Sequence, residues 1–436
     1  MAVFSIVIYN VLLSLGLLLG WPALLSMLIF IPKTRAGLMQ KIGFYPAELR
    51  AQLANKAPAQ KRIWFHTVSV GEFNAVRPLI AELTEPIGTF NVVLSCTTHT
   101  GYELARKTFP MLAVFYFPFD FQGIFQRTLP LVQPDLVALA ETELWPNFIY
   151  RITQIEKIPL ILINGRLSPK SFKGYRRIQT IMQPCLQQVS HFYMQSPGDA
   201  ERIQRLGDLP SERITVAGNL KFDLNPMVDP SKRAFLFQLL SIQEGDTVLT
   251  YASTHSGEDR PLLEVYQHLK QDFPELTLIL APRHPERVNE IKGILHHLKL
   301  DFSVRSQLTP EKPNREKLVL LDSIGELLTV YSFTTVAVMG GSFIERGGQN
   351  PLEALSQGVP VVFGPYMYNF SAISQIVLEH QAGCQVQNAQ VLIPTITRLL
   401  TQPEVYNSMA KQGLLLLEKN RGAKNILSQA IQTVLA

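Results

Sequence analysis

Three stretches of this sequence carry side chains that could take part in chemistry, and each follows an apolar run. A carboxylate, Glu72, comes directly after the run IWFHTVSV and Gly71. An arginine, Arg283, stands between two prolines in PRHPER, and a glycine-rich stretch, GGSFIERGGQNPLEA, begins at Gly340. A partly desolvated carboxylate can act as a general base, whereas arginines and helix N-termini bind phosphate. The residue types therefore suit proton transfer and phosphate binding.

Glu72 by itself allows two interpretations. Gly71 permits a sharp turn after the predicted strand, which would place Glu72 at the mouth of a cleft and at the start of the following helix. An acid in a first helical turn can also simply complement the helix dipole, for about 0.3 to 1 kcal/mol. The local sequence leaves a catalytic role and a purely local role open.

Short β-branched runs alternate with segments of helical length, which is the pattern of parallel sheets covered on both faces. The predicted strands lie at 62–70, 91–97, 113–118, 135–140, 159–164, 190–195, 214–217, 246–252, 276–281, 318–321, 335–339 and 359–363. Polar or glycine-rich clusters follow most of them. Ligands bind beyond the carboxyl ends of strands in open α/β sheets, so we expect an α/β protein with two sheets facing one cleft.

Length and composition agree with a large globular protein. The chain has 436 residues, of which 47% are hydrophobic, enough for two or three domains with their own cores. Its three cysteines are widely spaced and fit neither a disulfide framework nor a zinc site. This usage indicates a reducing compartment, such as the cytoplasm.

The first 32 residues predict a membrane anchor. No charged side chain occurs from Ala2 to Pro32, and the apolar run exceeds the roughly 20 residues that span a bilayer. The basic start and small-residue cleavage site of a signal peptide are not evident. Asn10 and Pro22 weaken a straight span, so a kinked or monotopic helix is an alternative, and a buried core helix is another.

The segment after this helix is strongly basic. Residues 33–62 have a net charge of +6, whereas the whole chain has +5, so the positive charge is local. Such a flank indicates a cytoplasmic location against the anionic lipids of the inner membrane. It argues against nucleic acid as a partner, which would need basic residues spread over a folded face.

Seven motifs together resemble the family of bacterial Kdo (3-deoxy-D-manno-oct-2-ulosonic acid) transferases. They occur in family order as WFHTVSVGE, ETELWPN, NGRLS, GNLKFD, ASTHSGE, PRHPER and GGSFIERGGQNPLEA. The resemblance implies a GT-B fold of two Rossmann-like domains, CMP-Kdo as donor, a lipid A precursor as acceptor, and inversion without a metal or other cofactor. The expected parts are a membrane anchor at 1–32, an acceptor domain at 33–223, a hinge at 224–232, a CMP-sugar-binding domain at 233–420 and a helix returning to the first domain at 421–436.

The resemblance also implies roles for individual residues. Glu72 matches the catalytic base of the family. The expected donor-binding residues are Ser253, Thr254, His255, Arg283, Gly340, Gly341, Ser342, Gly348, Gln349, Asn350 and Glu353. The expected acceptor-binding residues are Arg166, Lys170, Lys173 and Arg177, since a lipid A precursor bears two phosphates. The structural alternatives are a tight turn for the glycines, a pairing of Arg283 with Glu286, and a solvated helix face for the basic residues.

One position departs from the family pattern. The family usually has His where this chain has Gln349, and a Gln amide can donate a hydrogen bond but cannot carry a positive charge near pH 7. Stabilisation of the donor phosphate is therefore expected to be weaker here. Two rival functions remain at this point: another GT-B glycosyltransferase that uses a different nucleotide sugar on a lipid, and a non-catalytic membrane-tethered binding protein.

Overall fold

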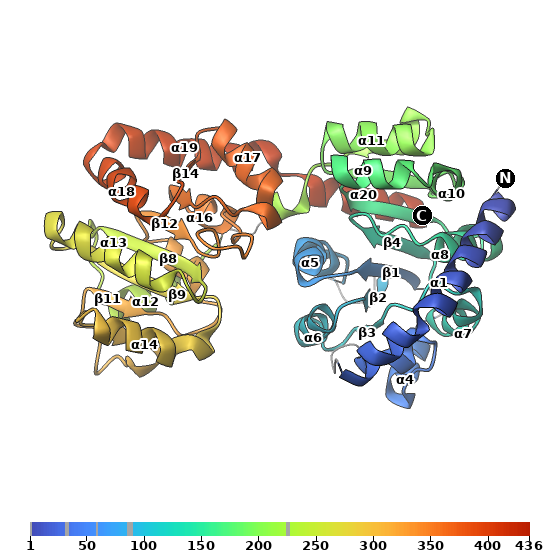
Figure 1. Ribbon diagram of the computed structural model, residues 1–436, viewed down its shortest axis with the longest axis horizontal. Coiled ribbons are helices and arrows are strands. Elements are labelled where there is room, and N and C mark those ends of the chain that lie inside the picture. The colour runs from blue at the N-terminus through green and yellow to red at the C-terminus, as the bar shows by residue number, and fades with distance from the viewer. Residues whose placement is uncertain (1, 31–34, 58–59, 85–89, 224–226) are drawn as a thin grey trace. The chain divides into compact units, whose positions relative to one another are not determined.

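The chain folds into two compact units. The computed structural model describes residues 2–30, 35–57, 60–84, 90–223 and 227–436. Met1–Asp223 and Asn420–Ala436 belong to the first unit, and Leu224–Lys419 form the second (Figure 1). Each unit is a parallel sheet with helices on its faces, so the predicted α/β fold class is confirmed.

The first unit contains a seven-stranded sheet in the order β3-β2-β1-β4-β5-β6-β7, and every strand pairing is parallel. The order reverses between β1 and β4, and such a reversal is where open α/β sheets bind ligands. The strands are β1 (Lys61–Thr67), β2 (Phe90–Cys96), β3 (Ala113–Tyr116), β4 (Leu136–Ala140), β5 (Leu160–Gly165), β6 (His191–Met194) and β7 (Ile214–Val216).

The helices that cover this sheet come from the N-terminal half of the chain and from its C-terminus. The last helix returns to the first unit and packs against α5, where Ala423, Leu427 and Ile431 are buried. The helices are α1 (Ala2–Phe30), α3 (Leu38–Lys41), α4 (Ala47–Ala54), α5 (Val70–Thr84), α6 (His99–Thr108), α7 (Gln122–Val132), α8 (Pro146–Tyr150), α9 (Pro169–Arg176), α10 (Gln179–Leu186), α11 (Pro197–Gly207) and α20 (Ala423–Leu435).

The second unit repeats this plan with the order β10-β11-β9-β8-β12-β13-β14, again with parallel pairings, and its reversal lies between β8 and β12. Its strands are β8 (Val248–Thr254), β9 (Thr277–Pro282), β10 (Ser303–Val304), β11 (Leu318–Leu320), β12 (Val336–Met339), β13 (Val361–Phe363) and β14 (Gly383–Gln385). Its helices are α12 (Pro230–Leu239), α13 (Asp259–Asp272), α14 (Val288–His297), α15 (Leu327–Tyr331), α16 (Leu352–Ser356), α17 (Ser371–Glu379), α18 (Leu392–Thr401) and α19 (Pro403–Asn420).

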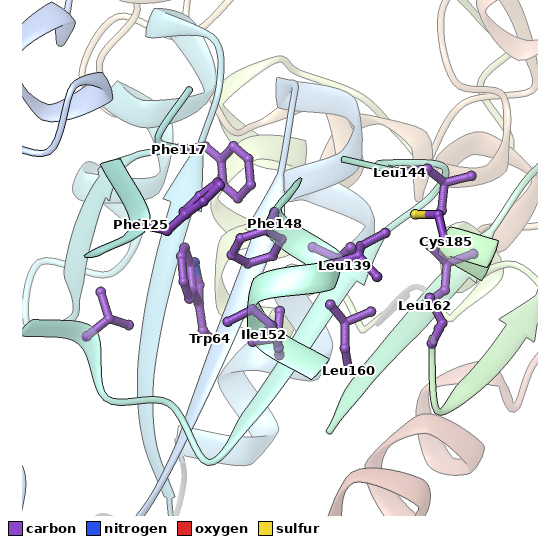
Figure 2. Close-up of a cluster of buried hydrophobic side chains, with 14 of the residues drawn as sticks. Trp64, Phe117, Phe125, Leu139, Leu144, Phe148, Ile152, Leu160, Leu162 and Cys185 are labelled. Atoms are coloured by element: carbon purple, nitrogen blue, oxygen red, sulfur yellow. The ribbon is translucent and has the colours of Figure 1, made fainter. Parts of the chain in front are cut away.

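An aromatic cluster supports the ends of the strands in the first unit. Trp64 on β1 packs edge-on against Phe148 on α8, with ring centroids 5.0 Å apart, and Phe117 lies 5.0 Å from the same ring (Figure 2). All three side chains are buried. Aromatic pairs of this kind contribute about 0.5–1.5 kcal/mol beyond their burial. The cluster therefore holds α8, and with it the loop between β4 and α8, in a fixed position.

Most strand bounds lie within two residues of the sequence prediction, and two differences bear on the candidate site and the hinge. β1 ends at Thr67 rather than at residue 70, because Ser69 and Glu72 already belong to the start of α5. α12 begins at Pro230, inside the segment 224–232 that was expected to be a hinge, since Asp229 caps its first turn. Residues 224–226 of that segment lie outside the described part of the chain.

Candidate active site

Glu72 lies in the first turn of α5, just beyond the carboxyl end of β1. Ser69 stands at the helix start, and its hydroxyl oxygen accepts the N–H of Glu72 at 3.4 Å. The Glu72 side chain turns back, so that its Oε2 accepts the N–H of Val68 at 2.7 Å. This arrangement resembles a capping box, and it fixes the carboxylate at the end of the sheet.

The surroundings of Glu72 increase its affinity for a proton. The pKa of Glu72 is raised to about 8, mainly by burial and in part by the charges of Glu141 and Glu143, whereas the N–H of Val68 opposes this rise. Burial also raises the pKa of Glu143 to about 7, although the Trp145 indole N–H donates to its Oε2 at 3.0 Å. Glu141 and Glu143 follow β4, the strand next to β1. At the reversal of strand order, the carboxyl groups of Glu72 and Glu143 therefore both titrate near neutral pH.

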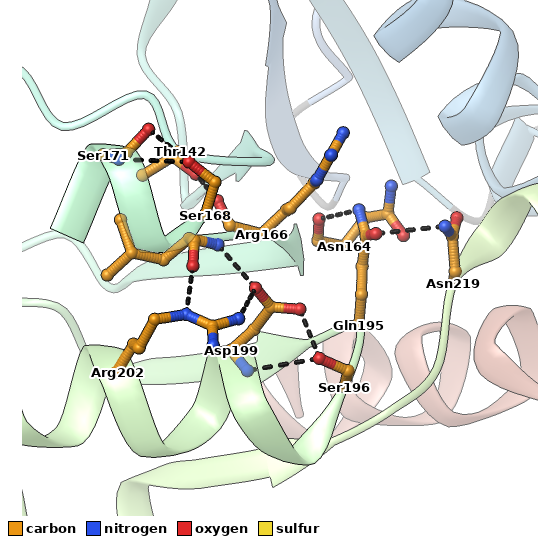
Figure 3. A network of polar contacts seen from close by, with 11 residues as sticks. Thr142, Asn164, Arg166, Ser168, Ser171, Gln195, Ser196, Asp199, Arg202 and Asn219 are labelled. Carbon is orange, nitrogen blue, oxygen red and sulfur yellow. Dashed lines mark hydrogen bonds and ion pairs between the residues drawn. The ribbon is translucent and has the colours of Figure 1, made fainter. Parts of the chain in front are cut away.

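A polar network fixes the loop after β5, which contains Arg166. The Asn164 Oδ1 accepts the N–H of Leu220 at 3.0 Å, and the Gln195 amide donates to the Asn164 carbonyl at 2.9 Å. Asn219 donates to Gln195 at 3.0 Å, which links the motifs NGRLS and GNLKFD (Figure 3). The Arg166 side chain extends away from this network in Figure 3. The loop is therefore rigid, while its arginine stays available to a ligand.

A second part of this network anchors the start of α9. Asp199, which is buried, accepts the N–H of Leu167 at 2.9 Å and forms an ion pair with Arg202 at 2.8 Å (Figure 3). The Ser168 hydroxyl caps α9 by accepting the N–H of Ser171 at 3.1 Å. These contacts hold the start of the helix against the sheet.

α9 presents a basic face to the solvent. Lys170, Lys173 and Arg177 are exposed and lie three and four positions apart, which places them on one side of the helix. Phe172 and Tyr175 pack against the core of the unit instead. This geometry fits both an anion-binding face and a solvated one.

In the second unit, one buried carboxylate joins the loops after β8 and β12. Glu258 is 1% exposed, and its side chain accepts the N–H groups of His255 at 2.8 Å and of Gly341 at 2.5 Å. Phe343 adds a third N–H at 3.4 Å. Burial raises the pKa of Glu258 to about 7, whereas these N–H donors lower it. Glu258 therefore orients both loops rather than only capping α13.

The glycines in these loops are required by close backbone contacts. A Cβ on Gly340 would lie 2.4 Å from the carbonyl oxygen of Ser253. Gly341 and Gly348 have positive φ angles of 66° and 73°, and the N–H of Gly348 donates to the Gly341 carbonyl at 2.8 Å. The loop 340–350 thus folds tightly beside the end of β8, as its glycine content predicts.

Two of the expected donor-binding hydroxyls are turned inward. The Thr254 hydroxyl donates to Asp259 at 2.6 Å, and the Ser342 hydroxyl donates to the Met339 carbonyl at 2.5 Å; both residues are buried. Ser342 also accepts the N–H of Gly364 at 2.7 Å. Both residues are 0% exposed, so they shape the loops from inside the fold and neither is presented to a donor in this structure.

His255 and Gln349 form a pair at the surface of the same loops. The Gln349 amide nitrogen lies 3.0 Å from Nε2 of His255. The pKa of His255 is lowered to about 4, mainly by burial and in part by the charges of His284, Arg346, Arg287 and Arg283. His255 is therefore neutral at pH 7, and its Nε2 accepts the Gln349 amide N–H.

Arg283 is exposed at the end of β9, where its backbone N–H donates to the Thr254 carbonyl at 2.9 Å. Glu286 lies 3.3 Å from His284 instead of forming the expected pair with Arg283. Among the described residues, no ion pair of Arg283 is present. The guanidinium group is thus available to an anion.

Arg287 was not singled out from the sequence, although it stands in the same motif PRHPER. It forms an ion pair with the buried Asp259 and another with Glu290 at 3.0 Å, and it donates to the Thr254 carbonyl at 3.2 Å. Arg287 therefore positions the loop after β8. The spacing of four residues from Arg283 offered no signal that the two arginines have different partners.

The remaining expected donor residues lie at α16. The Asn350 Oδ1 accepts the N–H of Leu352 at 3.2 Å, and Glu353 is in the first turn of that helix. Across the described part of the chain, no group of three or more His, Cys, Asp or Glu side chains could hold a metal ion.

Comparisons with known proteins agree on one family. The sequence profile described as 3-Deoxy-D-manno-octulosonic-acid transferase (kdotransferase) matches residues 36–224. A 3-deoxy-D-manno-octulosonic acid transferase of Haemophilus influenzae is 34% identical over 90% of this chain and 90% of its own length. The corresponding protein of Rickettsia felis is 31% identical over 79% of this chain and 72% of its own. A glycosyltransferase structure from Rickettsia africae, 12% identical with a TM-score of 0.55, covers 86% of this chain and 98% of that one, and shows a shared fold.

Proposed function

Since this chain belongs to the family of 3-deoxy-D-manno-octulosonic acid transferases, we propose that it transfers Kdo from CMP-Kdo to a lipid A precursor, with inversion at the anomeric carbon and without a metal. The observation that carries this proposal is the position of Glu72. It is a partly buried carboxyl group with a pKa of about 8 at the strand-order reversal of the first unit.

In the proposed reaction, an acceptor hydroxyl attacks the anomeric carbon of Kdo as the bond from that carbon to the CMP phosphate breaks. The hydroxyl proton passes to the Glu72 carboxylate, and CMP leaves with the electron pair of the broken bond. General-base catalysis of this kind typically contributes about 10²- to 10⁴-fold. It is effective near neutral pH only if the base has a pKa near the working pH, which burial and the neighbouring acids provide for Glu72.

We assign the donor to the second unit. Arg283 supplies an exposed guanidinium for the phosphate or the Kdo carboxylate, and the loop 340–350 supplies closely packed backbone N–H groups. Gln349 reaches the donor through its amide, or holds His255 in place for it. We assign Glu353, an acid in the first turn of α16, to the ribose hydroxyls.

We assign the acceptor to the first unit and the protein to the cytoplasmic face of the inner membrane. α1 has an apolar window at Phe4–Pro22 that is long enough to enter a bilayer. Arg166 and the exposed basic face of α9 (Lys170, Lys173 and Arg177) suit the phosphates of a lipid A precursor. Anionic lipids would attract the basic segment that follows α1.

Mass spectrometry of the lipid product tests this function. The full-length protein in membrane vesicles is given a lipid A precursor with either CMP-Kdo or a panel of UDP-sugars. We expect a mass increase of one or more Kdo units with CMP-Kdo alone. Transfer from a UDP-sugar, with none from CMP-Kdo, would show that the donor assignment is wrong, and absence of any transfer would support a binding protein.

A further inference from the structure

Polar side chains bind the first turns of α1 to the first unit. Asn10 and Asn147 exchange two amide hydrogen bonds of 2.8 Å each, and the Tyr9 hydroxyl hydrogen-bonds the Asp120 carboxylate. Asn147 is 0% and Asp120 is 6% exposed, so both partners lie inside the fold. Paired polar groups of this kind are costly to separate, because a buried Asn or Asp without a partner loses about 1–3 kcal/mol.

These contacts belong to a continuous docking face on α1. Ser5 and Ile6 are buried, and Ser5 donates to the Thr180 carbonyl at 3.0 Å. Leu13 is the next partly covered residue on the same side of the helix. α1 packs through this face against α8 and α10, and Figure 1 shows it beside α8. The start of the helix is therefore an integral part of the first unit.

The remaining surface of α1 is apolar and open. The exposed large side chains on it include Leu18 (70%), Leu19 (80%) and Phe30 (77%), and Trp21 is exposed as well. No charged residue occurs from Ala2 to Phe30. Such a surface needs an apolar environment, and a bilayer with Trp21 near its interface provides one.

From Ala36 onward the chain packs against the same unit. Ala36 packs against the core of the first unit, and a Cβ on Gly37 would lie 2.1 Å from the ring of Tyr116. The N–H of Phe119 donates to the Lys41 carbonyl at 2.8 Å, and Tyr45 is buried. The first turns of α1 and the chain from Ala36 onward are thus attached to one folded unit.

This attachment decides between the two membrane arrangements of α1. A spanning helix has its ends on opposite sides of the bilayer, about 30 Å of hydrocarbon apart. The first unit contains charged and polar groups at its surface that cannot enter the hydrocarbon. It therefore cannot hold one end of α1 on each side.

We propose that α1 is a monotopic helix, which lies in the membrane interface with both of its ends on the cytoplasmic side. Hydrogen bonds of Tyr9 and Asn10 hold it against the first unit. The proposal rests on the membrane location given under Proposed function. The partner of α1 is the lipid surface. Arg35 and Lys41, which follow the helix, provide positive charge that anionic lipids attract.

The contacts of Tyr9 with Asp120 and of Asn10 with Asn147 also connect α1 to the candidate active site. Asn147 follows Trp145 by two positions, and the Trp145 indole holds Glu143. The N–H groups of Asn147 and Phe148 donate to Asp120 at 3.1 and 2.8 Å, which ties the start of α8 to the residue that Tyr9 contacts. Asn10 is therefore a positioning residue for the loop that carries Glu143.

Protease protection of an N-terminal tag tests the topology. The full chain, with a hydrophilic cleavable tag before Met1, is made in a Gram-negative cell, and protease is added to spheroplasts and to inverted inner-membrane vesicles. We expect cleavage in inverted vesicles and protection in spheroplasts. Cleavage in spheroplasts alone would mean that α1 spans the membrane, and a protein found only in the soluble fraction would mean that α1 does not bind lipid; either result overturns the proposal.

Kdo transfer is measured in the same inverted vesicles, so the two proposals can fail separately. Transfer with a tag on the periplasmic side contradicts only the monotopic arrangement. A cytoplasmic tag without transfer supports that arrangement and contradicts the proposed function.

Two matched variants of α1 test the role of the contact between Asn10 and Asn147. Asn10→Leu removes the contact with Asn147, whereas Ser14→Leu makes the same kind of change four positions later, at an exposed residue. We expect Asn10→Leu to lower the melting temperature of the detergent-solubilised protein by several degrees and to slow transfer to detergent-dispersed acceptor, with Ser14→Leu unchanged in both. Equal behaviour of the two variants would remove Asn10 from its positioning role.

Discussion

Replacement of Glu72 by Gln separates a catalytic carboxylate from one that only completes a helix start. The Gln amide keeps the size of the side chain, and its oxygen can still accept the Val68 N–H that Glu72 accepts at 2.7 Å. The Ser69 hydroxyl at 3.4 Å can rotate to accept from the new NH₂ group. The helix start is therefore preserved, and only proton acceptance is lost.

Because the pKa of Glu72 is raised, this substitution should lower activity but increase the stability of the folded protein. The pKa of Glu72 increases from 4.5 to about 8 on folding, mainly because burial disfavours the charged form. Below pH 4.5 the group is protonated in both states and costs nothing. As the pH rises from 4.5 to 8, the unfolded chain releases the proton first, so the native protein loses stability by about 1.4 kcal/mol per pH unit. The full loss is roughly 5 kcal/mol at most, and solvent screening of this partly exposed group makes it smaller.

Glu72→Gln should therefore be slower but more stable than the parent protein at pH 8. We expect single-turnover transfer from saturating CMP-Kdo to fall by about 10²- to 10⁴-fold. The gain in melting temperature should be absent at pH 4.5 and grow up to pH 8. The transfer rate of the parent should increase with pH until about 8, because only the carboxylate form accepts the proton.

Glu48→Gln is the control, since Glu48 is an exposed first-turn acid of α4 in the same unit. It should change stability by under about 1 kcal/mol, with no effect on transfer. A folded Glu72→Gln protein within threefold of the parent rate would refute the assignment of Glu72 as the base. The base would then be sought among Glu141, Glu143 and Asp120.

Three further changes test the donor and acceptor faces. Arg283→Ala should weaken CMP binding about 10- to 100-fold by calorimetry, through the loss of a charge-assisted contact, whereas Arg260→Ala, an exposed arginine of α13, should leave it intact. Gly340→Ala forces a Cβ to within 2.4 Å of a backbone oxygen and should lower the melting temperature and abolish CMP binding; Gly293→Ala in α14, where nothing lies within 4 Å, should be neutral or stabilising. Lys173→Ala should raise the KM for a phosphorylated acceptor at low salt but not at high salt, and a salt-independent KM would remove the basic face of α9 from acceptor binding.

The sheets were well predicted from the sequence because parallel strands buried on both faces appear as continuous apolar runs. All twelve predicted strands are present within a few residues of their expected positions. β10 (Ser303–Val304) and β14 (Gly383–Gln385) were missed, since edge strands of two and three residues carry too little pattern. The predicted end of β1 at residue 70 was too far along the chain. The sequence could have corrected it, because Ser69 and Glu72 have the spacing of a capping box.

The sequence pointed to the residue types of the candidate site and not to their pairings. Glycines and charged residues after strands predicted a ligand site at the strand ends, and Glu72 and Arg283 lie at such ends. The hydrogen bond between Gln349 and His255, and the contact of Asn10 with Asn147, join residues 94 and 137 positions apart. No local pattern encodes contacts at that separation, because they form only when the sheets bring distant loops together.

The two strand-order reversals show how one architecture serves opposite charges. After β1 and β4, burial raises the pKa of Glu72 to about 8, with a smaller contribution from Glu141 and Glu143, so this carboxyl group binds a proton near neutral pH. After β8 and β12, burial lowers the pKa of His255 to about 4, and the charges of His284 and three nearby arginines contribute in the same direction. The exposed Arg283 at this end can attract an anion. Since each reversal belongs to its own sheet, a chain with two such units can adjust the proton acceptor and the anion site independently of each other.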